Sequence, residues 1–242
     1  MKSISVIMAF YNEERAIESA VLETKKALEE AGIDYEIILV DDGSKDNSRI
    51  IAAQLCADKN VKLLENIVNL NFGTATLRGM YSASKEYVIY NAADLPLNPY
   101  DIPEILEEMI NDNLQMMVLE RSEYKATAYR KIASKGNLLL LNILYPKLIR
   151  GTPVLNFVQC FRRDVLDEIK PYARSPIFVW PELIFRSKIN GFKWKNKIVP
   201  INTTMQVRQG SFGKPHDIIW GIYETVRFKV KERHVILNKD KR

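Results

Sequence analysis

Acidic and polar side chains follow three separate apolar segments of this 242-residue chain, and their types and spacing could support chemistry. Tyr11-Asn12-Glu13 follow the first segment, Asp41-Asp42 the second and Asp94 a later one. A single acid of this kind is common in turns and helix caps. Several carboxylates brought together repel one another unless a cation joins them. A divalent metal could in turn hold phosphates, which carboxylates cannot bind directly.

The elements that must position these residues follow from the hydrophobic pattern. Continuous apolar runs predict buried strands at 3–9, 36–40, 61–65 and 87–91. Helical periodicity and glycine stops predict the intervening helices at 13–31, 46–57 and 74–84. This alternation with short loops predicts a parallel sheet with right-handed crossovers. The residues that follow its strands should therefore converge at one edge.

The fourth predicted strand, Tyr87 to Asn91, leads into the lone acid Asp94. Pro96 and Pro99 prevent the strand from continuing. A carboxylate just past the carboxyl end of a buried strand lies where open α/β sheets bind ligands. The segment therefore predicts either a simple turn or, together with the other two clusters, a metal and nucleotide site.

The second half of the chain is less regular. We expect helices at 101–111, 126–148, 165–169, 181–189 and 217–231, strands at 115–119 and 155–161, and extended chain over 192–204. We find neither repeats nor a compositional break, so we expect one domain over residues 1–242. Its nucleotide-binding half would cover about 1–100 and its acceptor half about 101–232, followed by a basic tail at 233–242.

The composition, 47% hydrophobic and 27% charged, is that of an ordinary globular protein. The net charge of +5 suits a phosphate-rich ligand or an anionic membrane surface, and no aromatic-basic motif indicates nucleic acid. Two cysteines without a CxxC pattern argue against a disulfide framework or structural zinc. The apolar runs are far below the ~20 residues that span a bilayer. We therefore expect a cytoplasmic protein, with peripheral contact at the inner face of the membrane left open.

Several motifs in order resemble those of family 2 glycosyltransferases with the GT-A fold. They are residues 5–14 (SVIMAFYNEE), 38–46 (ILVDDGSKD), 71–73 (NFG) and 93–96 (ADLP). Later segments resemble the polyprenyl-phosphate, dolichol-phosphate mannose synthase-like branch: 120–122 (ERS), 129–137 (YRKIASKGN), 161–166 (FRRDVL), 178–183 (FVWPEL) and 208–211 (RQGS). The resemblance covers about residues 3–230. It implies an α/β, Rossmann-like GT-A domain with a mostly parallel central sheet flanked by helices and an irregular acceptor half.

The resemblance also implies roles for individual residues. Phe10, Tyr11 and Glu13 would line a nucleoside pocket. Asp42 would bind the base or ribose while Asp41 supports the turn, and we assign Asn91 to the same nucleotide-binding group. Asp94 matches the second acid of the family's D-x-D motif and would hold Mg²⁺ or Mn²⁺. We assign Asp94 and Glu182 as the catalytic residues, and Glu182 is equally compatible with a simple helix N-terminal charge.

A further group of residues is expected to meet phosphates or the acceptor, because arginine presents a planar fork to phosphate oxygens. This group comprises Arg121, Arg130, Lys131, Gln159, Arg208 and Ser211. For Arg130 and Lys131, a solvated helix face is the alternative.

The chain departs from the family pattern at two places. Ala92 stands where the first acid of D-x-D would be, so the phosphates of the donor would have to complete the metal site. The acceptor strand lacks the acid and glycine that usually precede F-R-R, which favours an acceptor phosphate that is already ionised near pH 7 over a hydroxyl that needs a base.

We therefore expect an inverting, non-processive glycosyltransferase that moves a sugar from a nucleotide sugar to an acceptor such as a polyprenyl phosphate. The processive Q-x-x-R-W motif is absent. Two alternatives stay open: transfer to a saccharide hydroxyl in surface-polysaccharide assembly, and a nucleotide-sugar-binding paralogue with weak or no turnover. The sequence leaves the base, the sugar and the oligomeric state undetermined.

Overall fold

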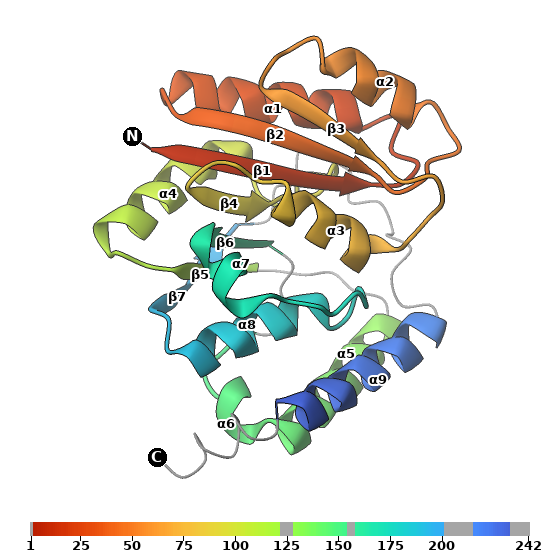
Figure 1. The fold of residues 1–242 in the computed structure, drawn as a ribbon, viewed down its shortest axis with the longest axis vertical. Coiled ribbons are helices and arrows are strands. Elements are labelled where there is room, and N and C mark those ends of the chain that lie inside the picture. The colour runs from red at the N-terminus through yellow and green to blue at the C-terminus, as the bar shows by residue number, and fades with distance from the viewer. Residues whose placement is uncertain (1, 122–127, 154–157, 201–214, 233–242) are drawn as a thin grey trace.

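The structure is a computed structural model that describes residues 2–121, 128–153, 158–200 and 215–232 (Figure 1). In this part of the chain, strands and helices alternate regularly up to β4 (Tyr87–Tyr90) and less regularly afterwards. The regular part corresponds to the segment in which the sequence predicted a repeated strand–helix unit.

In the described residues, seven strands form one sheet in the order β3-β2-β1-β4-β6-β5-β7. The strands are β1 (Ser3–Phe10), β2 (Asp34–Asp41), β3 (Val61–Glu65), β4 (Tyr87–Tyr90), β5 (Met116–Arg121), β6 (Val158–Arg162) and β7 (Trp194–Val199). Strands β3, β2, β1 and β4 are parallel, and β7 is parallel to β5. Strand β6 runs antiparallel to both β4 and β5. The predicted mostly parallel sheet is therefore confirmed, with β6 as an inversion that the sequence pattern did not indicate.

The helices surround this sheet. They are α1 (Ile17–Glu30), α2 (Ser48–Leu55), α3 (Phe72–Tyr81), the 3₁₀ turn η1 (Pro99–Asp101), α4 (Ile102–Asn111), α5 (Ala128–Leu144), α6 (Pro146–Ile149), α7 (Asp164–Ile169), α8 (Val179–Asn190) and α9 (Pro215–Lys231). Each predicted helix has a counterpart here. The clearest difference is that α1 begins at Ile17 rather than at Glu13, because the chain first turns through a left-handed residue, Asn12, at φ 56°.

Two hydrophobic clusters cover the two faces of the sheet. One packs α1, α2 and α4 on one face, through residues such as Ile17, Ala52 and Ile105. The other packs α3, α5, α7, α8 and α9 on the opposite face, for example through Leu183 and Phe228. Side chains alternate between these clusters along each strand, as the pleat of a sheet with both faces covered requires.

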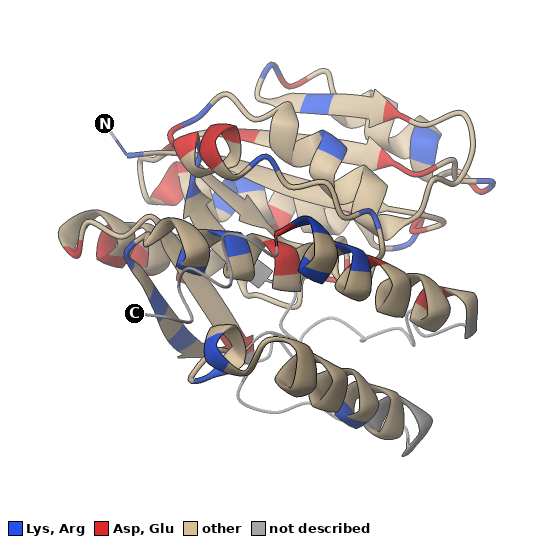
Figure 2. Cartoon of the chain, turned by 60° about the horizontal axis from the view of Figure 1, so that its bottom comes forward, with Lys and Arg blue, Asp and Glu red and all other residues tan. Residues whose placement is uncertain are grey.

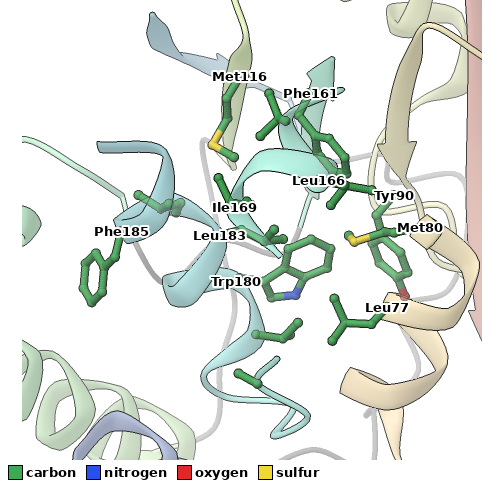
Figure 3. Packing of buried hydrophobic residues seen from close by; sticks show 14 of the residues in the cluster. Leu77, Met80, Tyr90, Met116, Phe161, Leu166, Ile169, Trp180, Leu183 and Phe185 are labelled. Atoms are coloured by element: carbon green, nitrogen blue, oxygen red, sulfur yellow. The ribbon is translucent and has the colours of Figure 1, made fainter. Parts of the chain in front are cut away.

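An aromatic contact between Tyr90 of β4 and Trp180 of α8 lies at the centre of the second cluster. Their ring centroids are 5.2 Å apart, and Phe72 at the start of α3 packs edge-on against Tyr90 at 5.4 Å. Figure 3 shows Trp180 facing Tyr90, with Leu77 and Met80 of α3 beside them. This contact ties the acceptor half to the end of β4 that leads to Asp94.

Helices α5 and α9 pack side by side at the far end of the molecule from α1 and α2 (Figure 1). The Tyr145 hydroxyl donates to the carbonyl of Thr225, and Lys229 Nζ donates to the carbonyl of Leu144 at 2.6 Å. Among the described residues, no helix is long and apolar enough to cross a membrane.

Candidate functional site

The carboxyl ends of β1, β2 and β4 lie next to one another, as the sequence predicted. Phe10 and Asp41 are paired across β1 and β2, and the Asp42 amide donates to the Phe10 carbonyl at 2.9 Å. On the other side of β1, the Asn91 amide donates to the Ile7 carbonyl at 3.0 Å. The chain segments that carry the three polar clusters therefore leave the sheet at one shared edge.

The loop after β1 is fastened to the loop after β2. The Asn12 amide donates to Ser44 Oγ at 3.0 Å, and Asn12 Oδ1 accepts from the Lys45 amide at 2.8 Å. The Glu13 amide donates to Ser48 Oγ at 2.7 Å. Tyr11 and Glu13 are both half-buried at this edge. The two loops therefore form one surface beside the ends of β1 and β2.

Phe10 differs from our expectation. Its side chain is 4% exposed and belongs to the cluster that packs α1 against the sheet. We expected Phe10 to line a nucleoside pocket, but here its ring is part of the hydrophobic core. The neighbouring Tyr11 is half-buried and lies at the surface of the site. The reason is the alternation of side chains along a strand, which turns residue 10 inward with Ile4, Val6 and Met8.

Asp41 supports the turn after β2, in the way that the resemblance implied. It is fully buried, accepts from the Ser44 amide at 2.9 Å through Oδ1, and accepts from Arg49 Nε at 2.7 Å through Oδ2. Gly43, at φ 76°, lies in the same turn, where a Cβ would come within 2.7 Å of the Val68 backbone. A side chain at residue 43 would therefore force the loop after β3 to move.

Asp42 organises the loop after β3. Its Oδ1 accepts from Asn66 Nδ2 at 2.9 Å and from the Leu70 amide at 2.8 Å, and the side chain is 4% exposed. Burial raises the pKa of Asp42, and the hydrogen bonds from Asn66 and Leu70 partly oppose this. Oδ1 of Asp42 is thus occupied by bonds to the loop after β3. The predicted role of Asp42 in binding the base or ribose would fall to the other carboxylate oxygen.

The same loop leads into α3, whose first turn is also held from the acceptor half. Asn71 adopts φ 79° and its side chain accepts from the Thr74 amide at 3.2 Å, which caps the helix. Gly73 follows, and a Cβ at this position would lie 2.1 Å from the Arg174 carbonyl oxygen. Glycine is therefore required where the loop before α8 crosses the start of α3.

The loop that contains Asp94 is closed by the side chain of Asn91. Asn91 Nδ2 donates to the Leu97 carbonyl at 2.9 Å, Asn91 Oδ1 accepts from the Leu97 amide at 3.3 Å, and the side chain is fully buried. Asp94 lies between these two residues in the sequence and is half-buried. We expected Asn91 to contact a nucleotide, but both of its polar atoms are bonded to the backbone of its own loop.

We predicted Asp94 as the residue that holds a metal, and this role stays a prediction. Within the described residues, no group of three or more His, Cys, Asp or Glu side chains could hold a metal ion. Ala92, which replaces the first acid of D-x-D, is half-buried and packs against the cluster that contains Tyr90. A metal site of one carboxylate completed by substrate oxygens fits Mg²⁺, which often keeps one or two protein carboxylates and takes other ligands from phosphates and water.

Glu182 lies inside the protein. It is fully buried, and its Oε2 accepts from the amides of Tyr172 and Ala173 at 3.0 and 2.5 Å. Its Oε1 accepts from Arg186 Nε at 2.8 Å. Burial raises the pKa of Glu182, and the bonds from Arg186 and the two amides oppose the rise. This environment favours a role in holding the loop before α8, and the catalytic role of Glu182 stays a prediction.

Glu224 of α9 completes this arrangement and was not identified from the sequence. It is 2% exposed and accepts from the amides of Arg174 at 3.0 Å and of Ser175 at 2.7 Å. Two buried glutamates from different helices thus hold four consecutive backbone amides, 172–175. Because this loop packs on Gly73, α8 and α9 together fix the position of the start of α3.

Gln159 and Trp180 are buried with unsatisfied polar atoms. Gln159 lies opposite Val118 in the sheet and is fully buried, and neither of its side-chain polar atoms has a hydrogen-bond partner in the described part of the chain. The same holds for Trp180 Nε1. Unpaired buried polar groups are unusual in folded proteins. Because Gln159 is enclosed within the protein, its acceptor role stays a prediction.

The side chains of the predicted phosphate-binding cations lie outside the described part of the chain. The backbone places Arg121 at the end of β5 and Arg130 and Lys131 in the first turn of α5. Arg208 and Ser211 lie outside the described residues. Their roles stay predictions.

Residues 5–214 match the glycosyl transferase family 2 profile. The chain belongs to glycosyl transferase family 2. The match includes the ends of β1, β2 and β4 and the whole acceptor half up to the start of α9. The predicted family is confirmed, and the shared edge that carries Asp42 and Asp94 is the candidate active site of a family 2 domain.

A curated relative of this family 2 domain is the undecaprenyl-phosphate 4-deoxy-4-formamido-L-arabinose transferase of Pectobacterium atrosepticum. It is 31% identical over 137 residues, which are 56% of this chain and 42% of the relative. The matched region thus spans less than half of that protein. The similarity agrees with the polyprenyl-phosphate branch that the motifs indicated.

Solved structures with the same fold include glucosyl-3-phosphoglycerate synthase from Mycobacterium tuberculosis. Its complex with Mg²⁺ and uridine diphosphate superposes with a TM-score of 0.67 at 18% identity, over 93% of this chain and 77% of that one. Its complex with Mn²⁺, uridine-diphosphate-glucose and phosphoglyceric acid gives the same score, identity and coverage. Similarity at this level establishes the fold, and the predicted GT-A class is confirmed.

Proposed function

We propose that this family 2 domain transfers a sugar from a nucleotide sugar to the phosphate of a polyprenyl phosphate, with inversion and one sugar at a time. The observation that supports the proposal is that the segments after β1, β2 and β4, which carry Glu13, Asp42 and Asp94, leave the sheet at one shared edge. An open α/β sheet binds its ligand at such an edge. Both the curated relative and the motifs of the acceptor half support a polyprenyl phosphate as acceptor.

The donor would lie along Tyr11 and Glu13 with its diphosphate toward Asp94. Mg²⁺ or Mn²⁺ would be held by the Asp94 carboxylate and by oxygens of the nucleotide, and a metal there neutralises charge that develops on the departing diphosphate. The protein's own part is to hold the loops that shape this edge. Asp41 and Asp42 do this through Ser44, Arg49, Asn66 and Leu70.

A phosphate acceptor agrees with the burial of two acids of the acceptor half, whose carboxylates accept hydrogen bonds from the backbone. Glu182 and Glu224 are buried and hydrogen-bonded to backbone amides. A phosphate oxygen is ionised near pH 7 and can attack the anomeric carbon without a strong protein base. This arrangement supports a phosphate over a saccharide hydroxyl.

A polyprenyl acceptor would bring the protein to a membrane surface, and α5 and α9 offer a suitable face. Both helices expose apolar side chains: Ile132, Leu138, Leu139, Ile143, Ile219, Ile222, Tyr223, Val226 and Val230. Helix α5 contains no acidic residue, and the two acids of α9, Asp217 and Glu224, are buried. In Figure 2 basic residues gather at the carboxyl-terminal end of α9. We propose that this α5–α9 face contacts an anionic bilayer.

A second candidate function is nucleotide-sugar binding without turnover. Ala92 favours it, because the loss of one acid leaves a single carboxylate for the metal.

One assay series distinguishes these functions. The protein is incubated with a panel of nucleotide sugars, Mg²⁺ or Mn²⁺, and either a short polyprenyl phosphate or saccharide acceptors. Sugar on the lipid phosphate is the expected result. Product on saccharides without any on the lipid would contradict the proposed acceptor. Metal-dependent nucleotide binding without any product would support the second candidate instead.

A further inference from the structure

The side chain of Asn91 makes two hydrogen bonds to the backbone of Leu97, at the edge of the candidate site. Asn91 is fully buried, and both of its amide atoms are bonded to one backbone unit, the carbonyl and the amide of Leu97. An asparagine side chain offers one donor and one acceptor in a plane, like a peptide group. It therefore closes the loop from residue 91 to residue 97 by pairing with the backbone of Leu97.

Other side chains could not make this bond. Aspartate has the right shape but lacks the donor when ionised. A negative carboxylate oxygen would then face the partially negative carbonyl oxygen of Leu97, and the two would repel each other. Leucine would fill the space but would leave the buried amide and carbonyl of Leu97 without partners, which is costly. The choice of asparagine at residue 91 thus has a geometric reason that involves no ligand.

The closed loop holds Asp94 in a constrained turn. The Leu95 amide donates to the Ala92 carbonyl at 2.9 Å, and Leu95 itself has a left-handed backbone with φ 43°. This conformation is unfavourable for a residue with a side chain. Ala93, Leu95 and Leu97 are all buried in the hydrophobic cluster that packs α1, α2 and α4 on the sheet. This packing holds the loop in place. The bond from Asn91 joins the two ends of this strained segment.

We propose that Asn91 is a positioning residue that fixes the direction of the Asp94 carboxylate, and not a ligand of the nucleotide. This inference rests on the proposed metal–nucleotide site at Asp94. With Ala92 in place of a second acid, metal binding depends on one carboxylate and hence on its orientation. Residues that orient a metal ligand typically contribute 10–100-fold to metal affinity, by order of magnitude.

The test compares Asn91→Asp with Asn98→Asp. Asn98 lies in the following turn and uses its side chain only as an acceptor, from the Tyr100 amide at 3.2 Å, so aspartate can replace it there. Binding of Mn²⁺ in the presence of uridine diphosphate is measured by electron paramagnetic resonance at pH 8 and pH 5.5. At pH 8, Asn91→Asp should bind about 10-fold or more weakly than wild type. Asn98→Asp should bind like wild type.

The pH comparison separates positioning from general damage. At pH 5.5 the introduced carboxyl, buried against a carbonyl, is protonated and regains a donor, so the ratio of variant to wild-type affinity should recover toward one. Equal affinities of Asn91→Asp and wild type at pH 8 would overturn the proposal. Equal losses in both variants would also overturn it, because added charge would then explain the effect.

Two outcomes concern the wild-type protein. Should Asn91→Asp fail to fold at pH 8, hydrogen exchange of the wild-type Leu97 amide replaces it. Slower exchange on addition of Mn²⁺ and uridine diphosphate supports the proposal, and unchanged exchange contradicts it. If wild type itself shows no metal-dependent binding of uridine diphosphate or of any other common nucleoside diphosphate, the proposed function fails first, before any variant is compared. If another nucleoside diphosphate binds, it replaces uridine diphosphate in the comparison of the variants.

Discussion

The Glu182 carboxylate accepts a hydrogen bond from Arg186 Nε at 2.8 Å, and no part of the Glu182 side chain reaches solvent. Arg186 in turn donates from Nη2 to Glu232 at 2.9 Å, so the pair joins α8 to the end of α9. Removing one member of a buried pair leaves the other without compensation, whereas exposed ion pairs contribute little. This contact therefore decides how a variant of Glu182 should behave.

We expect Glu182→Gln to lower the free energy of unfolding by about 2 kcal/mol, because Arg186 loses its fully buried carboxylate partner and keeps the more exposed Glu232, and one of the loop amides loses a charged acceptor. Urea unfolding followed by fluorescence measures this. Glu224→Gln is the matched control, since it interrupts the adjacent pair of loop amides without touching Arg186. If Glu182→Gln abolished turnover at unchanged stability, Glu182 would be the catalytic residue that the sequence suggested.

The second prediction concerns Asp94. Replacement by alanine should weaken metal-dependent binding of the nucleoside diphosphate by at least about 10-fold, since even outer partners of a metal ligand are worth that much. Isothermal titration with and without Mg²⁺ checks it. Binding in the absence of metal should change little. Identical metal-dependent affinities for variant and wild type would remove Asp94 from the site.

The third prediction concerns Ala92. Restoring the first acid with Ala92→Asp should increase the affinity for Mn²⁺ in the absence of nucleotide, because the site would gain a second carboxylate ligand. Ala92 is half-buried and packs against the cluster that contains Tyr90. Asn98→Asp, which adds charge to the same loop without completing the motif, is the control. A rise of equal size in both variants would mean that charge and not coordination is responsible.

The fourth prediction concerns Glu36, away from the site. Burial by itself raises the pKa of Glu36, but hydrogen bonds from Lys62, Ser5 and Ser84 outweigh it and lower the pKa to about 2. A lowered pKa stabilises the folded state above the ordinary pKa of glutamate, and this contribution is lost as the pH falls from about 5 toward 2. It amounts to about 3 kcal/mol. Urea unfolding between pH 7 and pH 3 should show this slope in wild type and a shallower one in Glu36→Gln.

The fifth prediction concerns the α5–α9 face. Ile143→Asp should weaken co-sedimentation with phosphatidylglycerol vesicles about tenfold, since it removes an exposed apolar contact and adds a charge of the same sign as the lipid. Ile143 is 68% exposed. Ile67→Asp, at a 96% exposed position in the loop after β3, is the matched control and should bind like wild type. A dimer that dissociates in Ile143→Asp, with no vesicle binding in wild type, would identify a second copy as the occupant.

Much of the site's framework could be predicted because it follows from local pattern. Apolar runs for β1, β2 and β4 and the acids that follow them are written in consecutive residues, and parallel topology then brings their ends together. The asparagines that hold the loops offered weaker signals. Asn71, three residues before Thr74, has the spacing of a helix cap. The bonds from Asn66 to Asp42 and from Asn91 to Leu97 have no signature in spacing.

Contacts between distant segments decided the rest. The antiparallel direction of β6 depends on how the irregular acceptor half returns to the sheet, and the sequence pattern is the same for either direction. The burial of Glu182 depends on α8 facing Arg186 and the 172–175 loop inward, although an isolated helix with a glutamate in its first turn would expose it. The sequence by itself determined which residue types meet at the edge of the sheet, because strand ends are local features. Only the tertiary structure decided which of them stay available and which hold loops, because a hydrogen-bonding side chain pairs with whatever donor or acceptor the fold brings within reach.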